Sequence, residues 1–275
     1  MPIACPITVR NISREEFDER DAVVMRCAYA SQNALGRLCD ERVYENDLAL
    51  RLRAEGFKSV HTQVPVTLSH GSFQKEYRLD LVADDALYEL KTVADFLPQH
   101  DTQALHYAML VSVGHAKLLN FRTPLVQGRL RFNTLTPERR RQLTWEYSAW
   151  RALSPECAAL NARVRDLLAD WGAFLESHAY EDALVHFCGG EALCVRRVPV
   201  VRDGVELGTH AVNCHTKGLA FVVTALTSTL AAQRSHLQKL LNLTPLNGLQ
   251  WLNLNHATIQ IVTLEKNDNR MGASE

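Results

Sequence analysis

No apolar run in this sequence is long enough to cross a membrane. The longest apolar stretches, such as residues 218–226, fall far short of the about 20 residues that a membrane-spanning helix needs. The N-terminal residues also lack the basic-then-apolar layout of a secretory signal. We therefore expect a cytoplasmic protein without a membrane partner.

Paired cysteines are missing as well. The seven cysteines make an odd number at irregular spacing and include no CxxC pair, which predicts reduced, mostly buried thiols rather than a disulfide framework. Cys188, Cys194, Cys214 and His215 form the best-placed group for a zinc ion, but their spacing matches no familiar ligand pattern. The sequence therefore does not favour a zinc site.

An excess of basic residues is the third feature that is absent. Lys and Arg number 30 and Asp and Glu number 31, which gives a formal net charge of −1. This balance does not point to nucleic acid, yet it does not exclude it, because a local basic groove can lie on a neutral body. The 275 residues, 47% of them hydrophobic, are typical of one large globular domain or two small ones.

The first half of the chain alternates helical and strand-like segments. Helices are expected over 14–30, with Ser13 as the N-cap, and over 33–55, ending at Gly56. Three β-like runs, a helix and a further strand follow, at 59–68, 74–83, 86–93, 99–111 and 115–121. This order predicts an α/β domain with a meander at its centre.

The second half begins with a change of composition after Phe121. Residues 137–187 carry leucine and alanine at helical spacing, and a strand-rich region follows Gly189-Gly190. The expected segments of that region are strands at 195–201, 210–214 and 219–226, a helix at 229–242 and a strand pair around 250–264. Residues 266–275 are expected to form a frayed tail. We divide the chain into a first domain (1–134), a helical connector (135–187) and a second α/β region (188–275).

The second α/β region has the same order of elements as the first. Val64-Pro65-Val66 recurs as Val198-Pro199-Val200, at an offset of 134 (198 − 64). The polar residues Asp80, Glu89, Lys91 and Gln103 would then fall on Cys214, Val223, Ala225 and Leu237. Two interpretations stay open: an inert copy of the first domain, serving as dimerisation-like support or as a substrate platform, or a chance similarity of two α/β halves.

The sharpest local signal is Tyr88-Glu89-Leu90-Lys91. Side chains alternate along a strand, so Glu89 and Lys91 share one face. On the preceding strand Asp80 lies opposite the apolar residues, and a turn near 83–85 would bring it beside Glu89. Two close carboxylates repel unless a cation or a proton lies between them, and Mg²⁺ accepts such oxygen ligands. The pattern predicts a metal site in which lysine assists water or offsets phosphate charge; a surface hairpin with a salt bridge is the alternative.

The helix before these strands carries two carboxylates on an apolar face. The residues that share the face are Leu38, Glu41, Glu45, Leu48 and Leu52. Because a buried, unpaired carboxylate is costly, the two glutamates either reach a metal or a basic partner, or the face lies at the edge of the domain.

The helix after the ExK strand carries His100, Gln103 and Tyr107 on one face. Its N-terminal end, with free N–H groups and a positive dipole, is suited to a phosphate. The same three residues would also be ordinary in a core or on a surface.

In these features residues 33–121 resemble the GxxExxY proteins, a branch of the PD-(D/E)XK nuclease-like superfamily. The resemblance covers about a third of the chain in six segments, in the right order: 41–48, 63–65, 77–81, 88–91, His100 with Gln103 and Tyr107, and 118–121. Two positions depart from the pattern. The glycine that names the motif is Leu38 here, with Gly36 two residues earlier, and Leu79 replaces the superfamily's proline, as is normal in this branch.

The resemblance implies a fold and a set of site residues. The fold would be a restriction-endonuclease-like core over residues 1–134, a mixed central sheet flanked by helices. Asp80 and Glu89 would be metal ligands and Lys91 the catalytic lysine. Glu41 would complete the acidic site as a further metal ligand, and Gln103 would be the polar residue borne by the helix.

Two functions fit these observations. The first is a Mg²⁺- or Mn²⁺-dependent phosphodiesterase that acts on DNA or RNA. Nucleic-acid contacts would come from Arg78, His100, Tyr107 and the run Arg139, Arg140, Arg141, although that run also suits a solvated helix face. The second is a non-catalytic nucleic-acid-binding or complex-assembly protein that keeps the fold, with a homodimer or protein partner docking through the second half. An unrelated ligand-binding α/β protein rests only on the weakness of the individual motifs.

Overall fold

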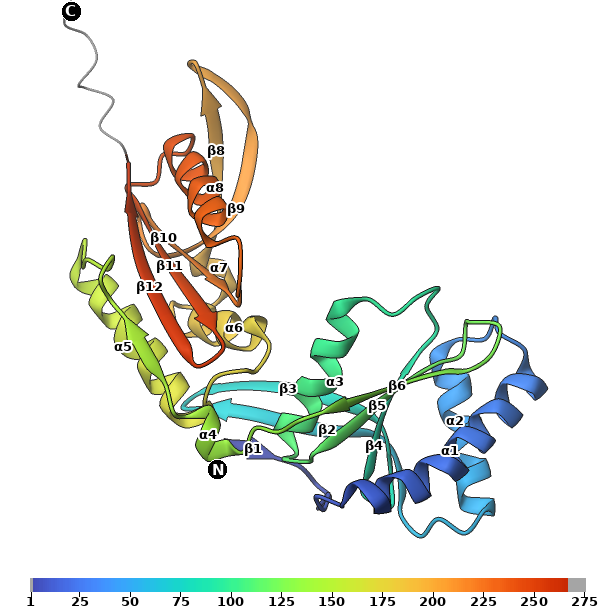
Figure 1. The fold of residues 1–275 in the computed structure, drawn as a ribbon. Coiled ribbons are helices and arrows are strands. Elements are labelled where there is room, and N and C mark those ends of the chain that lie inside the picture. Colours follow the sequence, from blue (N-terminus) through green and yellow to red (C-terminus); the bar gives the residue numbers. More distant parts are fainter. Residues whose placement is uncertain (1, 267–275) are drawn as a thin grey trace, which may run out of the picture. The chain divides into compact units, whose positions relative to one another are not determined.

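The computed structural model describes residues 2–266 (Figure 1). Apart from Lys266, the predicted tail lies outside the described residues. The chain divides into two units, Met1–Pro137 and Glu138–Glu275. Each unit holds one mixed sheet with helices packed against it, which confirms the predicted α/β fold class.

The first unit is built on a six-stranded sheet in the order β1-β2-β3-β4-β5-β6. Strands β2, β3 and β4 form the predicted antiparallel meander, and β4 then pairs in parallel with β5. A parallel pair needs a crossover connection, which α3 (Pro98–Leu110) supplies. The strands are β1 (Ile3–Ala4), β2 (Val60–His70), β3 (Phe73–Ala83), β4 (Ala86–Lys91), β5 (His115–Asn120) and β6 (Gln127–Phe132).

Two helices, α1 (Arg14–Leu35) and α2 (Glu41–Ala54), precede the meander. As predicted, Ser13 caps α1, and Glu16 closes a capping box with it. The second helix begins at Glu41 and not at residue 33, because Gly36 adopts a left-handed φ of 75° that ends α1. Leu38 therefore lies in the connecting loop, 81% exposed, and does not extend the apolar face of α2.

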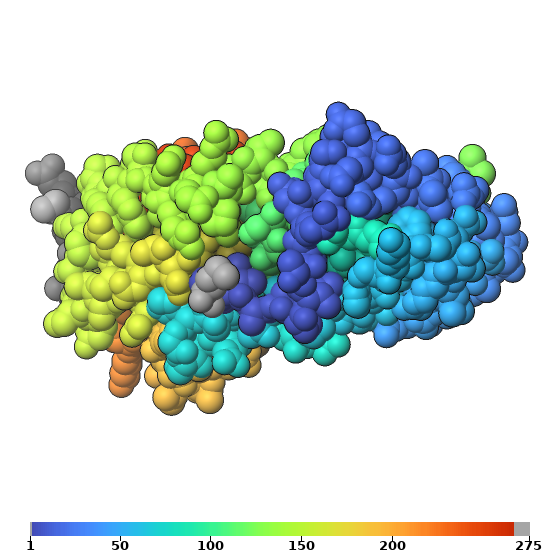
Figure 2. Space-filling model, turned by 90° about the horizontal axis from the view of Figure 1, so that it is seen from below, coloured from blue at the N-terminus to red at the C-terminus, as the bar shows by residue number. Residues whose placement is uncertain are grey.

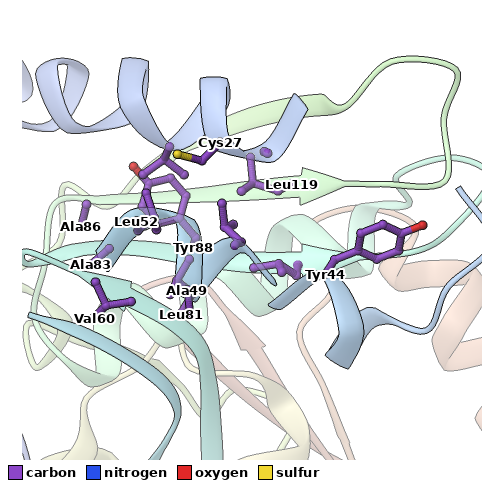
Figure 3. Packing of buried hydrophobic residues seen from close by; sticks show 14 of the residues in the cluster. Cys27, Tyr44, Ala49, Leu52, Val60, Leu81, Ala83, Ala86, Tyr88 and Leu119 are labelled. Carbon is purple, nitrogen blue, oxygen red and sulfur yellow. The ribbon is translucent and has the colours of Figure 1, made fainter. Parts of the chain in front are cut away.

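The core of the first unit lies between these two helices and the sheet (Figure 3). Tyr44 of α2 stacks on Phe121 with ring centroids 4.6 Å apart. Leu81, Tyr88 and Leu119 contribute from three neighbouring strands. Burying such side chains stabilises the fold by about 1.5–3 kcal/mol each. The outer faces of α1 and α2, in blue, form part of the surface seen in Figure 2.

The second unit has a sheet in the order β7-β12-β11-β10-β9-β8. Residues 135–187, assigned above to a connector, contribute α5 and α6 to this unit and also the short strand β7, which pairs with β12. The elements are α4 (Pro137–Arg140), β7 (Thr144–Glu146), α5 (Pro155–Trp171), α6 (Ser177–Phe187), α7 (Glu191–Cys194), β8 (Val195–Arg202), β9 (Val205–Thr216), β10 (Leu219–Thr224), α8 (Leu230–Asn242), β11 (Gly248–Asn255) and β12 (Thr258–Glu265).

The strand pairing of the second unit repeats that of the first. Strands β8, β9 and β10 form an antiparallel meander, β10 is parallel to β11 across α8, and β12 returns antiparallel to β11. Helices α5 and α6 precede this meander as α1 and α2 precede the other. The edges differ, because β1 lies beside β2 whereas β7 lies beside β12.

A tyrosine–glycine hydrogen bond recurs where the two helices of each unit are joined. The Tyr44 hydroxyl donates to the Gly36 carbonyl oxygen at 2.7 Å, and the Tyr180 hydroxyl donates to the Gly172 carbonyl oxygen at 2.6 Å. Both glycines have a φ of 75° and end the first helix of their pair. The same side-chain contact thus closes the same junction in both units.

An asparagine clamp recurs at the end of the central strands. Asn120 accepts from the Val93 N–H and donates to the Val93 carbonyl oxygen, at 3.2 and 2.8 Å. Asn253 does the same with Leu226, at 2.8 and 2.9 Å. Two independent side-chain contacts at matching places support the interpretation that the second unit is a repeat of the first.

The clamps also correct the alignment of the two halves. Asn253 follows Asn120 by 133 residues (253 − 120) and not by 134. Glu89 and Lys91 then match Val222 and Thr224. At this offset Tyr88 matches Phe221. Since Leu81 pairs with Tyr88 and Asn213 pairs with Phe221, Leu81 matches Asn213, and the preceding residues Asp80 and Val212 match each other. In a repeat with this alignment, the residues that match Asp80, Glu89 and Lys91 are uncharged, as they are at the offset of 134, but they stand at different positions.

No helix within residues 2–266 combines the length and the apolar character that crossing a membrane requires.

The recurring tyrosine contacts should stabilise each unit separately. We expect Tyr180→Phe to lower the free energy of unfolding of the second unit by about 1 kcal/mol, because the buried Gly172 carbonyl loses its hydroxyl donor. All four tryptophans lie in the second unit, so tryptophan fluorescence in urea reports on it alone. Tyr44→Phe should shift the far-UV circular dichroism transition and leave the fluorescence transition in place. The exposed Tyr29→Phe is the control. If Tyr44→Phe and Tyr180→Phe changed the unfolding free energy as little as Tyr29→Phe does, the tyrosine–glycine hydrogen bonds would not stabilise the two units.

Candidate active site in the first unit

The meander brings Asp80 and Glu89 together. Leu81 pairs with Tyr88 across β3 and β4, so the next residues along, Asp80 and Glu89, are also neighbours. Since Leu81, Tyr88 and Leu90 belong to the core under α1 and α2, the residues between them point away from that core. Asp80 and Glu89 are both buried, at 8% and 2% exposed.

Asp80 is held by two donors. Its Oδ2 accepts the Leu90 N–H at 2.8 Å, across the strand pair, and its Oδ1 accepts from Gln63 Nε2 at 3.2 Å. The backbone of β4 therefore fixes the orientation of the first carboxylate.

Glu89 is the less satisfied of the two. Its Oε1 accepts from Lys91 Nζ at 2.6 Å, whereas its Oε2 is buried without a hydrogen-bond partner. Burial, and then the neighbouring charge of Asp80, raise the pKa of Glu89 well above its ordinary value, and a protonated Glu89 would hydrogen-bond Asp80. The Oε2 atom of Glu89 therefore lacks a donor or cation that would stabilise a negative charge on it.

Lys91 faces three carboxylates. Burial by itself would lower the pKa of Lys91, but Glu89, Glu41 and Asp80 together raise it above the ordinary value. The side chain is only 12% exposed and forms its ion pair with Glu89. Lys91 is thus a fixed ammonium group and not a neutral amine.

Glu41, at the first position of α2, belongs to the same cluster. Burial and the charges of Asp80 and Glu45 raise the pKa of Glu41, while Lys91 and the backbone of Thr92 act to lower it. The carboxylate is half-buried, and so open to solvent on one side. The structure therefore places Glu41 near Asp80, Glu89 and Lys91, but not in an arrangement with Asp80 and Glu89 that would hold a metal ion.

The three predicted site residues of α3 have different surroundings. His100 is buried, accepts the Leu97 N–H at its Nδ1 and lies close enough to Lys91 for the ammonium to lower its pKa, after the larger effect of burial. Gln103 donates to the Tyr107 hydroxyl at 3.1 Å. Tyr107 is buried against Tyr77 and His106. His100 thus borders the acidic cluster, whereas Gln103 and Tyr107 bond to each other.

The predicted arginines lie elsewhere. Arg78 is exposed on β3 and pairs with Glu76 at 2.6 Å. Arg139, Arg140 and Arg141 fall in the second unit, at the end of α4 and just after it. Arg140 is 2% exposed, and burial lowers its pKa, so it has no surface to offer a nucleic acid. None of these arginines contributes to the acidic cluster.

Two residues of the cluster were not among the predicted site residues. Glu45, only 1% exposed, accepts from Arg42 at 2.8 Å and from Gln63 Nε2 at 2.6 Å. Gln63 thereby joins Glu45 to Asp80, and it does so from a left-handed φ of 51° that is rare for a residue with a side chain. The helical spacing of Glu41 and Glu45 pointed to Glu45, whereas no helical or strand spacing pointed to Gln63.

The acidic cluster carries an excess of negative charge that a divalent cation would balance. Asp80, Glu89, Glu41 and Glu45 outnumber the two cations Lys91 and Arg42, and the buried Glu89 Oε2 is unpaired. In the described part of the chain no three His, Cys, Asp or Glu side chains are arranged to hold a metal ion. An ion here would thus be held by Asp80 and Glu89, with other positions left to water, an arrangement that Mg²⁺ accepts.

We expect Mg²⁺ or Mn²⁺ to stabilise the first unit through Glu89. An ion at about 100 times its Kd adds about 2.7 kcal/mol to the unfolding free energy, and Glu89→Gln should abolish this gain because the ligand oxygen becomes an amide. Thermal unfolding by far-UV circular dichroism, with ion or chelator, measures the effect. Glu76→Gln, on the same hairpin but exposed, is the matched control; an unchanged gain in Glu89→Gln would rule out Glu89 as a ligand.

Gln63→Ala should weaken Mn²⁺ binding about tenfold, because Asp80 loses the amide that orients it. Isothermal titration calorimetry provides the Kd. The exposed Gln74→Ala, also in the β2–β3 hairpin, should bind like the wild type. Equal affinity in both variants would show that Leu90 alone suffices to orient Asp80.

Comparison with known proteins covers the unit that holds this cluster. Residues 18–132 match the family model described as the PD-(D/E)XK nuclease superfamily. Searches of curated proteins and of solved structures found no match. The match begins inside α1 and ends with β6, so it includes every residue of the acidic cluster. The GxxExxY branch stays a prediction, but in sequence the first unit is similar to the PD-(D/E)XK nuclease superfamily.

Proposed function

We propose that the first unit is a metal-dependent nuclease that hydrolyses phosphodiester bonds of DNA or RNA. The observation that carries the proposal is the buried pair of Asp80 and Glu89, with the Lys91 ammonium beside it and one carboxylate oxygen unpaired. The match to a nuclease superfamily over residues 18–132 supports the same reaction class.

Each residue has a defined task in this proposal. Asp80, fixed by the Leu90 N–H, and Glu89 would hold Mg²⁺ or Mn²⁺. The ion would supply Lewis-acid chemistry at the phosphate. Lys91 offsets negative charge that develops on the phosphoryl oxygens.

Three further residues would support these. Glu41, half-buried beside Lys91, extends the acidic set to the solvent side. His100 borders Lys91 at the start of α3, where a phosphate would meet the helix N-terminus. Gln63 holds Asp80 and Glu45 in place.

The second unit would take no part in the chemistry. Val212, Val222 and Thr224 stand where the first unit has Asp80, Glu89 and Lys91, and the Thr224 hydroxyl bonds to Asn253 and to Trp251. This observation favours a second candidate function, a nucleic-acid-binding or assembly role for the whole chain. A homodimer or protein partner on the second unit stays a prediction.

Cleavage of labelled single- and double-stranded DNA and RNA, with Mg²⁺, Mn²⁺ or chelator, tests the proposal. We expect metal-dependent cutting that falls by at least about 100-fold in Glu89→Gln and in Lys91→Met, since each removes a charge that the transition state needs. Glu76→Gln should cut normally.

Binding measurements on the same substrates separate the two functions. No cutting combined with retained nucleic-acid binding would favour the binding or assembly role. No cutting together with no calorimetric signal for metal would overturn the assignment of Asp80 and Glu89.

A further inference from the structure

Arg42 is joined to the candidate active site by a short chain of hydrogen bonds. Its Nη1 atom donates to Glu45 Oε1 at 2.8 Å. Gln63 Nε2 then bridges Glu45 Oε2 and Asp80 Oδ1, at 2.6 and 3.2 Å. Because the Glu45 side chain is only 1% exposed, it anchors the guanidinium two side chains away from Asp80, the first carboxylate of the proposed metal pair.

The Arg42 side chain is nevertheless open to solvent. It is 55% exposed, whereas the Lys91 side chain is 12% exposed and ion-paired with Glu89. A guanidinium carries five N–H donors, and the hydrogen bond to Glu45 uses one of them. Further donors of Arg42 can therefore meet an acceptor that approaches the cluster from solvent.

The charge of the acidic cluster makes such a donor useful to a polyanionic substrate. One divalent ion would formally balance the four carboxylates and two cationic side chains of the cluster, so no surplus positive charge would remain at the metal pair. The Lys91 ammonium is bound to Glu89. A nucleic acid therefore needs a cation at the solvent edge of the cluster to offset its charge, and Arg42 stands at that edge.

The second unit shows that the fold does not need a guanidinium at this place. His178 precedes Glu181 by three residues, as Arg42 precedes Glu45, and its Nδ1 atom lies 3.3 Å from a Glu181 carboxylate oxygen. Glu181 in turn accepts from Asn213 on β9 at 2.6 Å. The same junction between helix and strand thus forms with a histidine, in the unit whose strands lack the acidic pair. The arginine accompanies the acidic pair and not the fold.

We propose that Arg42 binds a backbone phosphate of the nucleic acid, next to the phosphodiester bond that the metal pair would cleave. This inference rests on the proposed function for its substrate class. The planar guanidinium fork matches two oxygens of one phosphate, and Glu45 holds the fork on the side of the cluster. The contact is made to the backbone and not to a base, so it positions the strand without selecting a sequence.

The experiment measures binding of labelled DNA to the full-length protein at several NaCl concentrations, in chelator so that no strand is cut. Arg42→Gln keeps an N–H donor for Glu45 but loses the charge. We expect its slope of log K against log salt to be less steep than that of the wild type, by about 0.9 for double-stranded and about 0.7 for single-stranded DNA. Arg42→Lys should keep the wild-type slope and bind several-fold more weakly, because the charge stays and the fork is lost.

Two control variants remove similar pairs elsewhere. Arg51→Gln breaks an ion pair with Asp47 on the same helix, at 2.6 Å, and His178→Gln breaks the corresponding contact of the second unit. Both should bind DNA with the wild-type slope and affinity.

Cleavage with Mg²⁺ gives an independent readout. Arg42→Gln should raise KM several-fold and leave kcat nearly unchanged, because a backbone contact away from the reacting phosphate is lost from the bound substrate and the transition state alike. A fall in kcat at unchanged KM would overturn the proposal.

The remaining outcomes separate this proposal from the proposed function. A wild-type slope in Arg42→Gln, wild-type affinity in Arg42→Lys, or an equal loss of slope in Arg51→Gln would overturn the role of Arg42, whether or not the protein cuts. Wild-type protein that binds DNA without cutting it would refute the nuclease, and the slopes would still decide on Arg42. Wild-type protein that does not bind DNA at any salt concentration would overturn both.

Discussion

The stability of the first unit depends on how the charges of two neighbouring buried carboxylates, Asp80 and Glu89, are compensated. The β3–β4 register makes Asp80 and Glu89 neighbours inside the fold, where their repulsion is only weakly screened. Lys91 compensates one oxygen of Glu89 and leaves the other unpaired. The surrounding groups, from the Leu90 N–H to the Gln63 amide, orient Asp80 but add no full positive charge. A proton or a cation is the remaining way to balance the pair, and this links the stability of the unit to its proposed chemistry.

The second unit has the same order of strands in its meander as the first unit but lacks the acidic residues of the candidate site. It therefore shows which contacts the fold needs by itself. It keeps the contacts that join its elements, namely the tyrosine hydroxyl on the helix-ending glycine and the asparagine clamp after the central strands. Glu181, which follows Tyr180 as Glu45 follows Tyr44, accepts from Asn213 at 2.6 Å. The carboxylates of the strands are replaced by valines that pack with the core under α8. Core packing and junction contacts therefore suffice for the architecture of the second unit, which forms without an acidic pair on its strands.

The first unit uses an unusual backbone conformation to place a polar group. Gln63 has a left-handed φ in mid-strand, and its amide reaches both Glu45 and Asp80. A residue held in a rarely populated conformation persists where surrounding contacts determine it. Local backbone geometry is thus the means by which distant parts of the sequence become chemical neighbours here.

The sequence by itself determined the α/β class, the β2–β3–β4 meander and the strand positions of Asp80, Glu89 and Lys91, because period-two alternation and hairpin turns are local properties. It did not show the outer strands β1, β6 and β7. It did not determine the break at Gly36, the contribution of residues 135–187 to the second unit, or the offset of 133 that the asparagine clamps give between the two units. These depend on contacts between distant residues, such as Tyr44 with Gly36 and Asn253 with Leu226. The role of Gln63 and the burial of Arg140 are of the same kind. A polar side chain in sequence does not show whether it will lie in solvent or in a core; only packing between distant segments decides which groups lose water and must find partners.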